Sequence, residues 1–568
     1  MSKFVIYEVI PRLFGNNTTT NKRQGNIQEN GCGKFNDFTP KALKAIKELG
    51  ATHVWYMGVI EHATQTNYSA YGILQDNSSV VKGSAGSPYA IKDYYDVDPD
   101  LAENVENRMK EFEALVKRTH KAGMKVIIDF VPNHVARQYH SDAKPKGVID
   151  LGEKDCTDYA FTPANNFYYL PQQPFSPHFD LQGYTEYPAK ATGNDQFTAS
   201  PNEHDWYETV KLNYGVDYME GRQKHFHPIP DTWEKMLDIL LFWVSKGIDG
   251  FRCDMAEMVP VEFWGWVIPH VKKAFPNVIF IAEIYQPNEY RNYICNGKFD
   301  YLYDKVGMYD TLRGIMSHNH SAQGITYAWQ GLGDITDRML NFLENHDEQR
   351  IGSGFFCGSG IYAQPAMIIS ATLTKGPVMI YFGQELGELG MDSEGFSGVD
   401  GRTTIFDYWG VKSLQAWTNN GKFDGAGLTA EQKELRNFYQ KLLNIVNTEK
   451  AISEGVMYDL VYANLGRHKF NSHQIFAFFR KHKDNLLLIV VSFHDQPLDT
   501  EIHIPQEAFQ YLGMDEGLTY QCVDLLDKKT KYPDVELSSW KNFEVVMPAW
   551  KGKIFQLMVN GKARRRRG

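Results

Sequence analysis

The chain has 568 residues, of which 43% are hydrophobic and 23% are charged. This balance is typical of a folded globular protein and excludes a disordered chain, a collagen and a small disulfide scaffold. The net charge of −10 argues against nucleic acid as a partner, because nucleic-acid-binding proteins carry a basic balance.

Short apolar runs alternate with amphipathic helices from residue 4 to about residue 390. After a run over 4–10, Thr39 and Pro40 predict the N-cap and first residue of a helix that Gly50 ends. The second apolar run covers 53–60 and the third covers 125–131. Apolar residues at helical spacing predict a helix over 109–119 between these runs and another over 232–246 after them. The remaining runs cover 248–253, 278–284, 299–303, 339–343 and 378–382.

These eight runs are almost continuously apolar, as expected for parallel strands that are covered on both faces. Eight such strands alternating with helices predict an α/β fold, a (β/α)8 TIM barrel, over residues 1–134 and 226–450. Residues 135–225 follow the third strand without a clean helical stripe and predict an inserted domain. The short β-rich runs over 451–560 predict a C-terminal antiparallel β-sandwich domain, and 561–568 a basic, solvated tail.

The cysteines and the apolar runs bear on the compartment. The six cysteines form no CxxC pair and no zinc-spaced cluster with histidine, which favours free thiols in a reducing compartment. No apolar run reaches about 18 residues, so we expect no membrane span, and no signal peptide is visible. We expect a cytoplasmic protein, or a periplasmic or extracellular one if a leader was trimmed. No pattern in the sequence fixes an oligomeric state.

Polar residues follow several of the predicted strands at the end where barrel enzymes place their catalytic groups. They are Asp129, Asn133 and His134 after the third strand, Arg252 and Asp254 on and after the fourth, Glu283 after the fifth, and His346 and Asp347 after the seventh. Any one of them alone can be a cap or a loop hydrogen-bond acceptor. Three carboxylates around one barrel mouth are hard to explain as packing, because buried carboxylates are costly unless they are paired or used.

Two carboxylates on either side of a bond are what glycoside hydrolysis requires. Asp254 lies two residues after Arg252, so the two side chains share one face of a strand, and Arg252 is expected to hold Asp254 ionised. Glu283 has no basic neighbour in the sequence and stands among apolar residues, which is expected to raise the pKa of this carboxyl and to suit a general acid.

Six segments resemble, in order, those of the alpha-amylase superfamily, glycoside hydrolase family 13, and the whole chain resembles bacterial alpha-amylase-like glucan hydrolases. They are SPYAIKDYYDVDP, DFVPNH, GFRCD, the Glu of FIAEIY, ENHD and GPVMIYFGQELGE. The resemblance implies that Asp254 is the nucleophile, Glu283 the acid/base and Asp347 the third carboxylate, which binds and distorts the sugar.

The resemblance also implies roles for the residues around these carboxylates. It makes Arg252 the arginine that orients the nucleophile, and His134 and His346 the histidines that hydrogen-bond the same sugar. Tyr89 matches the tyrosine that stacks against that sugar, with a core aromatic as the alternative reading. Asp129 matches a carboxylate that mainly braces the site.

The chain departs from the family where a calcium ion usually binds. Asn133 matches a calcium-ligating asparagine, but Lys211 in VKLNYG stands where many members have an aspartate. A lysine at the place of a carboxylate ligand argues against a hard cation there. We therefore expect no required cofactor and no metal ligands, with a structural calcium possible but not expected.

The function expected from these residues is retaining hydrolysis of α-1,4-glucosidic bonds in starch-like α-glucans or maltooligosaccharides. A transglycosylase that passes the same glycosyl intermediate to a sugar is the enzymatic alternative. A non-catalytic glucan-binding protein is disfavoured because the chain keeps all the carboxylates and histidines. Aromatic residues of the inserted domain are expected either to stack on sugars or to form its core: Phe167, Tyr168, Tyr169 and Phe175.

Overall fold

In a computed structural model, which describes residues 3–560, eight parallel strands form one sheet in the order β15-β14-β13-β12-β5-β2-β1-β16. A parallel bridge between Asn341 and Val378 joins the two ends of this sheet and closes it into a barrel. The TIM barrel prediction is therefore confirmed. The strands are β1 (Val5–Val9), β2 (His53–Tyr56), β5 (Lys125–Phe130), β12 (Gly250–Cys253), β13 (Ile279–Ala282), β14 (Tyr301–Tyr303), β15 (Met339–Leu340) and β16 (Val378–Tyr381).

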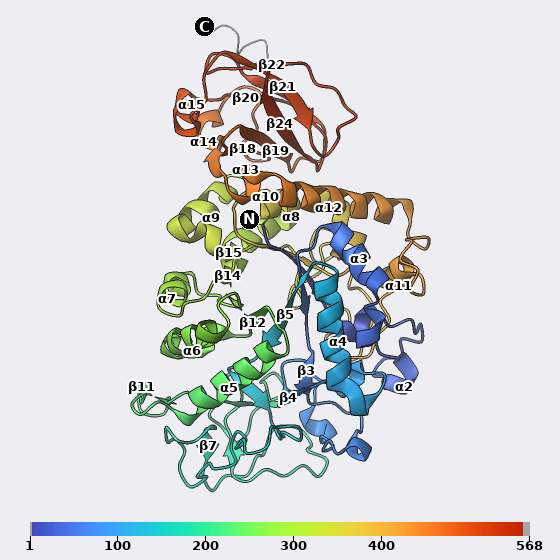
Figure 1. Ribbon diagram of the computed structural model, residues 1–568, viewed down its shortest axis with the longest axis vertical. Helices are drawn as coiled ribbons and strands as arrows, with labels where there is room; N and C mark the ends of the chain where they lie inside the picture. Colours follow the sequence, from blue (N-terminus) through green and yellow to red (C-terminus); the bar gives the residue numbers. More distant parts are fainter. Residues whose placement is uncertain (1–2, 561–568) are drawn as a thin grey trace.

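Helices surround the barrel (Figure 1) and are α3 (Pro40–Leu49), α4 (Arg108–Lys121), α5 (Asp231–Ser245), α6 (Val261–Ala274), α7 (Tyr290–Cys295), α8 (Asp310–His318), α9 (Gly324–Leu332), α10 (Gln364–Thr372), α11 (Lys412–Thr418) and α12 (Ala430–Thr448). The helix α3 has the predicted ends. The Thr39 side chain accepts a hydrogen bond from the N–H of Ala42, and Gly50 ends the helix with φ of 118°. Two one-turn helices, α1 (Pro11–Phe14) and α2 (Ile27–Asn30), follow β1.

The apolar run over 53–60 contains two strands rather than one. The barrel strand β2 ends at Tyr56, and Gly58 has φ of 71°, a left-handed conformation that turns the chain. Ile60 then begins β3 (Ile60–His62), which pairs antiparallel with β4 (Ile91–Val97) outside the barrel sheet. Continuous hydrophobicity hid this break because both strands are buried.

The inserted segment after β5 is built from short strand pairs and loops. Its pairs are β6 (His134–Ala136) with β9 (Thr209–Lys211), β7 (Tyr169–Leu170) with β8 (Ala189–Lys190), and β10 (Val216–Asp217) with β11 (Gln223–Lys224). It lies at one end of the barrel, and the C-terminal domain lies at the other (Figure 1). This placement follows from its position after β5, because the carboxyl end of that strand leads into it.

The C-terminal domain consists of antiparallel sheets around a core of its own, as predicted. Six strands form one sheet, in the order β17 (Val456–Asp459), β18 (Ile475–His482), β19 (Asn485–Ser492), β24 (Gly552–Val559), β21 (Leu518–Asp524) and β22 (Val535–Leu537). The pair β20 (Leu498–Ile502) and β23 (Phe543–Met547) contributes to the same core. Its helices are α13 (Lys450–Ser453), α14 (Val461–Asn464) and α15 (Gln506–Leu512). The tail predicted over 561–568 lies outside the described residues.

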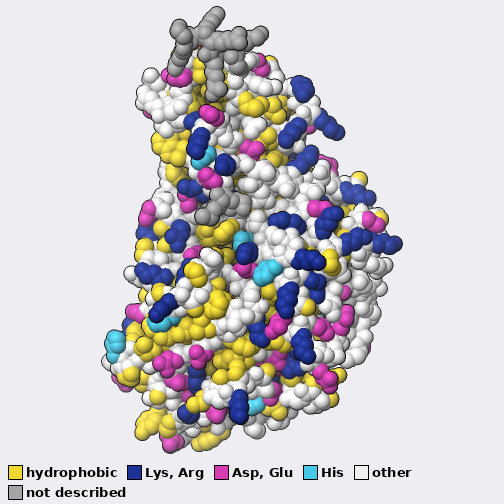
Figure 2. Space-filling model, in the orientation of Figure 1, with side chains coloured by type: hydrophobic (Ala, Val, Ile, Leu, Met, Phe, Trp, Pro, Cys, Tyr) yellow, Lys and Arg dark blue, Asp and Glu magenta, His cyan; other side chains and the backbone are white. Residues whose placement is uncertain are grey.

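Charged side chains of both signs are interspersed on the visible face of the molecule (Figure 2). Within residues 3–560, no helix combines the length and the apolar character needed to cross a bilayer.

The buried Arg480 on β18 joins the C-terminal domain to the barrel. Its guanidinium donates to the carbonyl of Leu373, at the end of α10, at 2.9 Å, and to carbonyls of Ala451, Ile452 and Gly455. Four backbone acceptors therefore depend on one side chain that is 2% exposed.

We expect Arg480→Met to lower the free energy of unfolding by about 3 kcal/mol or more, because each buried acceptor left unpaired costs roughly 1 to 3 kcal/mol. Denaturant unfolding measures this change. Arg467→Met is the matched control, since Arg467 is exposed and bonds one local carbonyl. Equal effects of the two substitutions would contradict the structural role of Arg480.

Candidate active site

The guanidinium of Arg252 lies at the centre of the candidate site and contacts three carboxylates. Arg252 is the third residue of β12, and the parallel ladder with β5 places it beside Asp129. Its Nη1 lies 2.7 Å from Oδ1 of Asp254 and 3.6 Å from Oδ1 of Asp129, and its Nη2 lies 2.9 Å from Oε2 of Glu283. The Arg252 side chain is 1% exposed, so a single buried cation connects carboxylates from three neighbouring strands.

Asp129 is held in place by groups other than Arg252. Its Oδ2 accepts hydrogen bonds from the Trp55 indole at 3.1 Å and from the N–H of Gly58 at 3.2 Å. Burial raises the pKa of Asp129, while Arg252 lowers it in part. These bonds tie the carboxylate to β2 and the turn after it, which is the bracing position that the sequence predicted for Asp129.

Asp254 follows the last residue of β12 and keeps one oxygen free. Its Oδ1 accepts from Arg252, whereas its buried Oδ2 has no hydrogen-bond partner among the residues that the structure describes. The next residue, Met255, has φ of 43°, a conformation that is unfavourable for a residue with a side chain. In this turn the N–H of Met255 donates to Oε2 of Glu283 at 2.7 Å. A strained turn thus links the two candidate catalytic carboxylates through the backbone.

Glu283 stands in a polar environment, and the prediction of an apolar one was wrong. Oε2 contacts Arg252 and Met255, and the Tyr285 hydroxyl donates to Oε1 at 2.6 Å. The residues next to Glu283 in the sequence are apolar and misrepresent its environment. In the sheet β12 lies next to β13 and brings Arg252 to Glu283. Tyr285 was missed, although a spacing of two residues places side chains on one face of an extended segment.

Burial decides the protonation of Asp254. Desolvation raises the pKa of Asp254 to about 7, because Arg252 lowers it only in part and the charge of Glu283 raises it further. The expectation that Arg252 holds Asp254 ionised was therefore wrong, since it left out both the desolvation and the second carboxylate.

His346 connects Asp347 to the interior of the barrel. Its Nε2 lies 3.0 Å from Oδ2 of Asp347 and 2.7 Å from the hydroxyl of Tyr89, and its Nδ1 lies 2.6 Å from Oε1 of Glu8. Burial lowers the pKa of His346, but the two carboxylates outweigh it and raise the pKa to about 10. Desolvation at the cavity wall opposes ionisation of Asp347, yet the charge and hydrogen bond of His346 lower its pKa to about 2.

His134 begins β6 and is a neutral imidazole. Burial and the ammonium of Lys211 lower the pKa of His134 to about 3. The ring centroid lies 5.2 Å from that of Trp206, and Nδ1 lies 3.1 Å from Nδ2 of Asn133. A neutral imidazole can donate one hydrogen bond and accept another, which suits contact with hydroxyl groups.

These side chains border a cavity of about 370 Å³, a size typical of small-molecule sites. Five of the seven predicted site residues line it: Tyr89, His134, Asp254, Glu283 and Asp347. Arg252 and His346 do not line the cavity, but they contact residues that do: Arg252 contacts Asp254 and Glu283, and His346 contacts Asp347. The other lining residues are Lys82, Ser87, Trp206, Glu208, Thr209, Met255, Tyr285, Ile405 and Phe406. Sequence analysis did not single out any of these as site residues, although Ser87 and Tyr285 lie within two of the matched segments and Thr209 begins β9.

The family model of the alpha amylase catalytic domain matches residues 9–455. The chain belongs to the alpha-amylase family, glycoside hydrolase family 13. It is 24% identical over 521 residues to alpha-amylase 3 of Dictyoglomus thermophilum, covering 86% of this chain and 84% of the relative. It is 22% identical over 400 residues to a cyclomaltodextrin glucanotransferase of Geobacillus stearothermophilus, covering 67% of this chain and 49% of the relative.

The fold agrees with this membership. The crystal structure of a noncanonic maltogenic alpha-amylase from Thermotoga neapolitana superimposes with a TM-score of 0.62 at 19% identity, covering 98% of this chain and 99% of the other. At this identity the likeness concerns the fold alone. In this chain that fold is a barrel followed by a C-terminal antiparallel domain.

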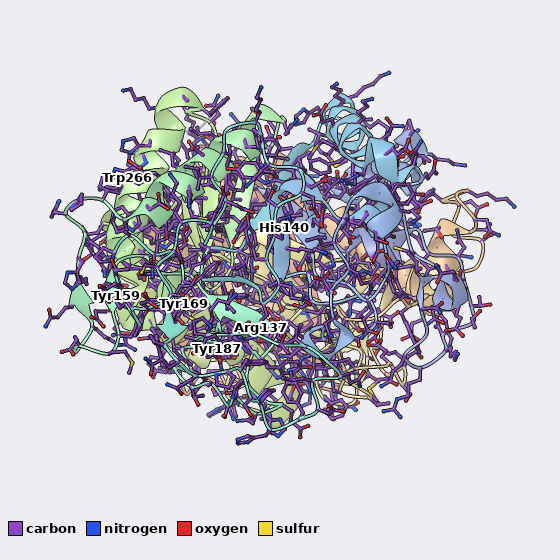
Figure 3. All side chains as sticks on the ribbon, turned by 90° about the horizontal axis from the view of Figure 1, so that it is seen from below. Arg137, His140, Tyr159, Tyr169, Tyr187 and Trp266 are labelled. Atoms are coloured by element: carbon purple, nitrogen blue, oxygen red, sulfur yellow. The ribbon has the colours of Figure 1, made fainter. Side chains whose placement is uncertain are left out.

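The aromatic candidates of the inserted segment are core residues, and the expectation that they stack on sugars was wrong. Each is at most 7% exposed: Phe167, Tyr168, Tyr169 and Phe175. The Tyr168 hydroxyl donates to the carbonyl of Val216 at 2.7 Å, inside the segment. Figure 3 looks onto this side of the alpha-amylase family barrel and labels Tyr169. The aromatic residue that the segment does supply to the cavity is Trp206.

A lysine is bound at the place where the resemblance locates calcium. Nζ of Lys211 lies 2.6 Å from Oδ1 of Asn133 and 2.6 Å from Oδ1 of Asp195, and the side chain is 2% exposed. Both oxygens that a hard cation would take are thus paired with an ammonium, so these residues do not fit calcium. Within residues 3–560, no group of three or more histidines, cysteines, aspartates or glutamates is arranged to hold a metal ion.

We expect EDTA to leave the melting temperature nearly unchanged, because the cation that contacts Asn133 and Asp195 is the ammonium of Lys211 and not a metal ion. A bound ion would stabilise the fold by mass action and its removal would lower the melting temperature. Lys211→Met is expected to lower the free energy of unfolding by about 1.5 to 3 kcal/mol, the contribution of hydrogen bonds to a charged group. A large drop on chelation that calcium reverses would contradict this expectation.

The raised pKa of Asp254 predicts a pH-dependent cost to stability. The unfolded chain releases this proton near the ordinary pKa of 3.8 and the folded chain only at about 7, so stability falls as the pH rises between these values. Asp254→Asn removes this cost. It should stabilise the protein increasingly from pH 4 to 7, by at most about 4 kcal/mol at about 1.4 kcal/mol per pKa unit.

Denaturant unfolding at several pH values measures the effect. The matched control is Asp158→Asn, an exposed aspartate of the inserted segment, which should give no such trend. Stabilisation by Asp254→Asn that is equal at every pH would contradict the assigned protonation.

Proposed function

We propose that the chain is a retaining glycoside hydrolase that cleaves α-1,4-glucosidic bonds in starch-like α-glucans or maltooligosaccharides. The observation that supports this most directly is the shared guanidinium of Arg252, which contacts both Asp254 and Glu283 at the wall of one cavity. Glycoside hydrolysis uses two such carboxyl groups, and in a double displacement one of them acts as nucleophile and the other as acid and base.

In the proposed first step, Oδ2 of Asp254 attacks the anomeric carbon. This oxygen is free of hydrogen bonds, whereas Oδ1 is engaged by Arg252. The bond to the leaving oxygen breaks as that oxygen takes a proton from Glu283, and a covalent glycosyl ester forms on Asp254. This step requires Asp254 in its ionised form and a proton on Glu283.

The acid/base oxygen of Glu283 is Oε1 in this proposal. Oε2 receives Met255 and Arg252, so Oε1 is the oxygen left for the leaving group. Tyr285 donates to Oε1 at 2.6 Å, and a bound sugar would take over that position. In the second step Glu283 takes a proton from water, which attacks the ester and releases the sugar with its configuration retained.

Asp347 and the aromatic wall are proposed to hold the sugar. Asp347 is an anion with a side chain 43% exposed in the cavity wall, placed to accept hydrogen bonds from sugar hydroxyls. Tyr89 and Trp206 offer ring faces on which sugar rings pack. His134 contributes a neutral donor and acceptor.

Transglycosylation is the second candidate function, and the names of some relatives support it. The relatives include cyclomaltodextrin glucanotransferase and neopullulanase as well as alpha-amylases. Both reactions share the glycosyl ester and differ only in whether water or a sugar attacks it. A non-catalytic role is disfavoured by the retained carboxylates.

Product analysis tests the proposed function. We expect maltoheptaose and soluble starch to give only shorter maltooligosaccharides, because water attacks the intermediate. Chromatography of the products over time measures this. Products longer than maltoheptaose would favour the transglycosylase, and intact substrate at high enzyme concentration would contradict both.

Replacement of each carboxylate should affect turnover in a different way. Glu283→Gln should lower kcat about 10²- to 10⁴-fold, the contribution of general acid–base catalysis, with little change in binding. It should still form the ester from an activated glycosyl fluoride, whose leaving group needs no proton. Asp254→Asn should form no ester.

Mass spectrometry of the Glu283→Gln protein treated with the fluoride locates the ester. We expect the sugar on the peptide that contains Asp254. A sugar on the peptide that contains Asp347 would overturn the assignment of the nucleophile.

A further inference from the structure

Glu8 is a buried carboxylate that the proposed reaction does not use directly. It lies on β1, is 0% exposed and has register partners on β2 and β16, Trp55 and Tyr381. Its Oε1 lies 2.6 Å from Nδ1 of His346, and its Oε2 has no hydrogen-bond partner among residues 3–560. Burying an isolated carboxylate is energetically costly, so the burial of Glu8 needs an explanation, and its contact with His346 is the place to look for one.

Both ring nitrogens of His346 face oxygen atoms. Nδ1 meets the Glu8 carboxylate, and Nε2 meets Oδ2 of Asp347 at 3.0 Å and the Tyr89 hydroxyl at 2.7 Å. The Tyr89 hydroxyl donates to Oδ1 of Asp129 at 3.3 Å, so its oxygen accepts from Nε2. An ionised carboxylate only accepts, so with Glu8 and Asp347 both ionised both ring nitrogens donate. Burial raises the pKa of Glu8, and the charge and hydrogen bond of His346 lower it in part.

Aromatic neighbours fix the plane of this ring. The Trp55 ring meets His346 edge to face at 5.6 Å, and the Tyr89 ring stacks on it at 5.2 Å. The imidazole therefore has one orientation, in which a line of hydrogen bonds runs from Glu8 through His346 to Asp347.

We propose that Glu8 is a positioning residue that holds His346 as an imidazolium, so that His346 in turn holds Asp347 as an oriented anion at the cavity. This inference rests on the proposed function only for the role of Asp347. Glu8 itself does not line the cavity and acts through His346.

The charges around His346 are consistent with this role. Those that face it from the elements packed around the ring are Glu8 on β1, Asp129 on β5, Arg252 on β12, Tyr89 before β4, and Asp347 beside it. Arg252 is already shared by three carboxylates, so His346 is the cation that contacts Glu8 and Asp347. Without Glu8, only Asp347 would stabilise that cation directly.

Nitrogen-15 NMR of the histidine side chains tests the proposal without turnover. In the unmodified chain, His346 should remain an imidazolium through pH 8, since its pKa is raised to about 10. Glu8→Gln keeps the shape and removes the charge, and should lower the pKa of His346 by about one to three units. Glu8→Asp keeps the charge and should restore most of the shift.

The pH profile of kcat/KM provides the functional test. Glu8→Gln should keep most activity near pH 6, where His346 is still charged, and should lose it on the alkaline side one to three units earlier than the unmodified chain. The matched control is Glu385→Gln, because Glu385 is equally buried but bonds the Tyr7 hydroxyl at 3.0 Å. It should move neither the pKa of His346 nor the alkaline limb.

Three results would overturn the proposal. They are a pKa of His346 near 6.5 in the unmodified chain, an unchanged pKa in Glu8→Gln, or an equal loss of activity at every pH. If the unmodified chain cleaves no α-glucan, the proposed function fails while the NMR titration still decides the role of Glu8. If Glu8→Gln does not fold, the titration of the unmodified chain and of Glu8→Asp decides it.

Discussion

The candidate site depends on one desolvated positive charge. Arg252 lies on a central strand of the barrel sheet, 1% exposed, and contacts carboxylates that belong to three neighbouring strands. Without it, Asp129, Asp254 and Glu283 would be buried carboxylates without a cation, which is strongly destabilising. Burial raises the pKa of Asp254 to about 7, since Arg252 lowers it only in part and the charge of Glu283 raises it further.

A second group of charges, formed by Glu8, His346 and Asp347, completes the site. His346 sits between Glu8 in the barrel interior and Asp347 at the cavity, and it lowers the pKa of Asp347 to about 2. The site thus holds two carboxyl groups with contrasting pKa values, that of Asp254 raised to about 7 and that of Asp347 lowered to about 2. Environments that push the pKa values of neighbouring groups apart are the pattern by which acid and base roles are separated.

The barrel was predictable from the sequence because its strands are buried on both faces and read as continuous apolar runs. The same continuity concealed the break at Gly58, where β2 ends and β3 begins. The helix α3 was predictable at both ends from Thr39 and Gly50, since capping is a local property. The site residues were found because strand ends in a barrel converge, whatever the distance along the chain.

The environment of each site residue was harder to predict. Glu283 looked isolated from charge along the chain, but Arg252 reaches it from the next strand. Lys82 and Trp206 reach the cavity from loops that carry no motif, and Glu8 acts from the first strand, 338 positions from His346. The resemblance to the family drew attention to Lys211, but its partner Asp195 could not be predicted, because the two residues meet only in the folded inserted segment.

The stereochemistry of the first product tests the central claim most directly. If Asp254 attacks the sugar under the control of Arg252 and Glu283, two inversions occur and the newly formed reducing end is initially the α-anomer. Proton NMR of maltoheptaose cleavage, recorded before mutarotation, distinguishes the anomers. Appearance of the α-anomer first is the result this account predicts, and appearance of the β-anomer first would contradict it.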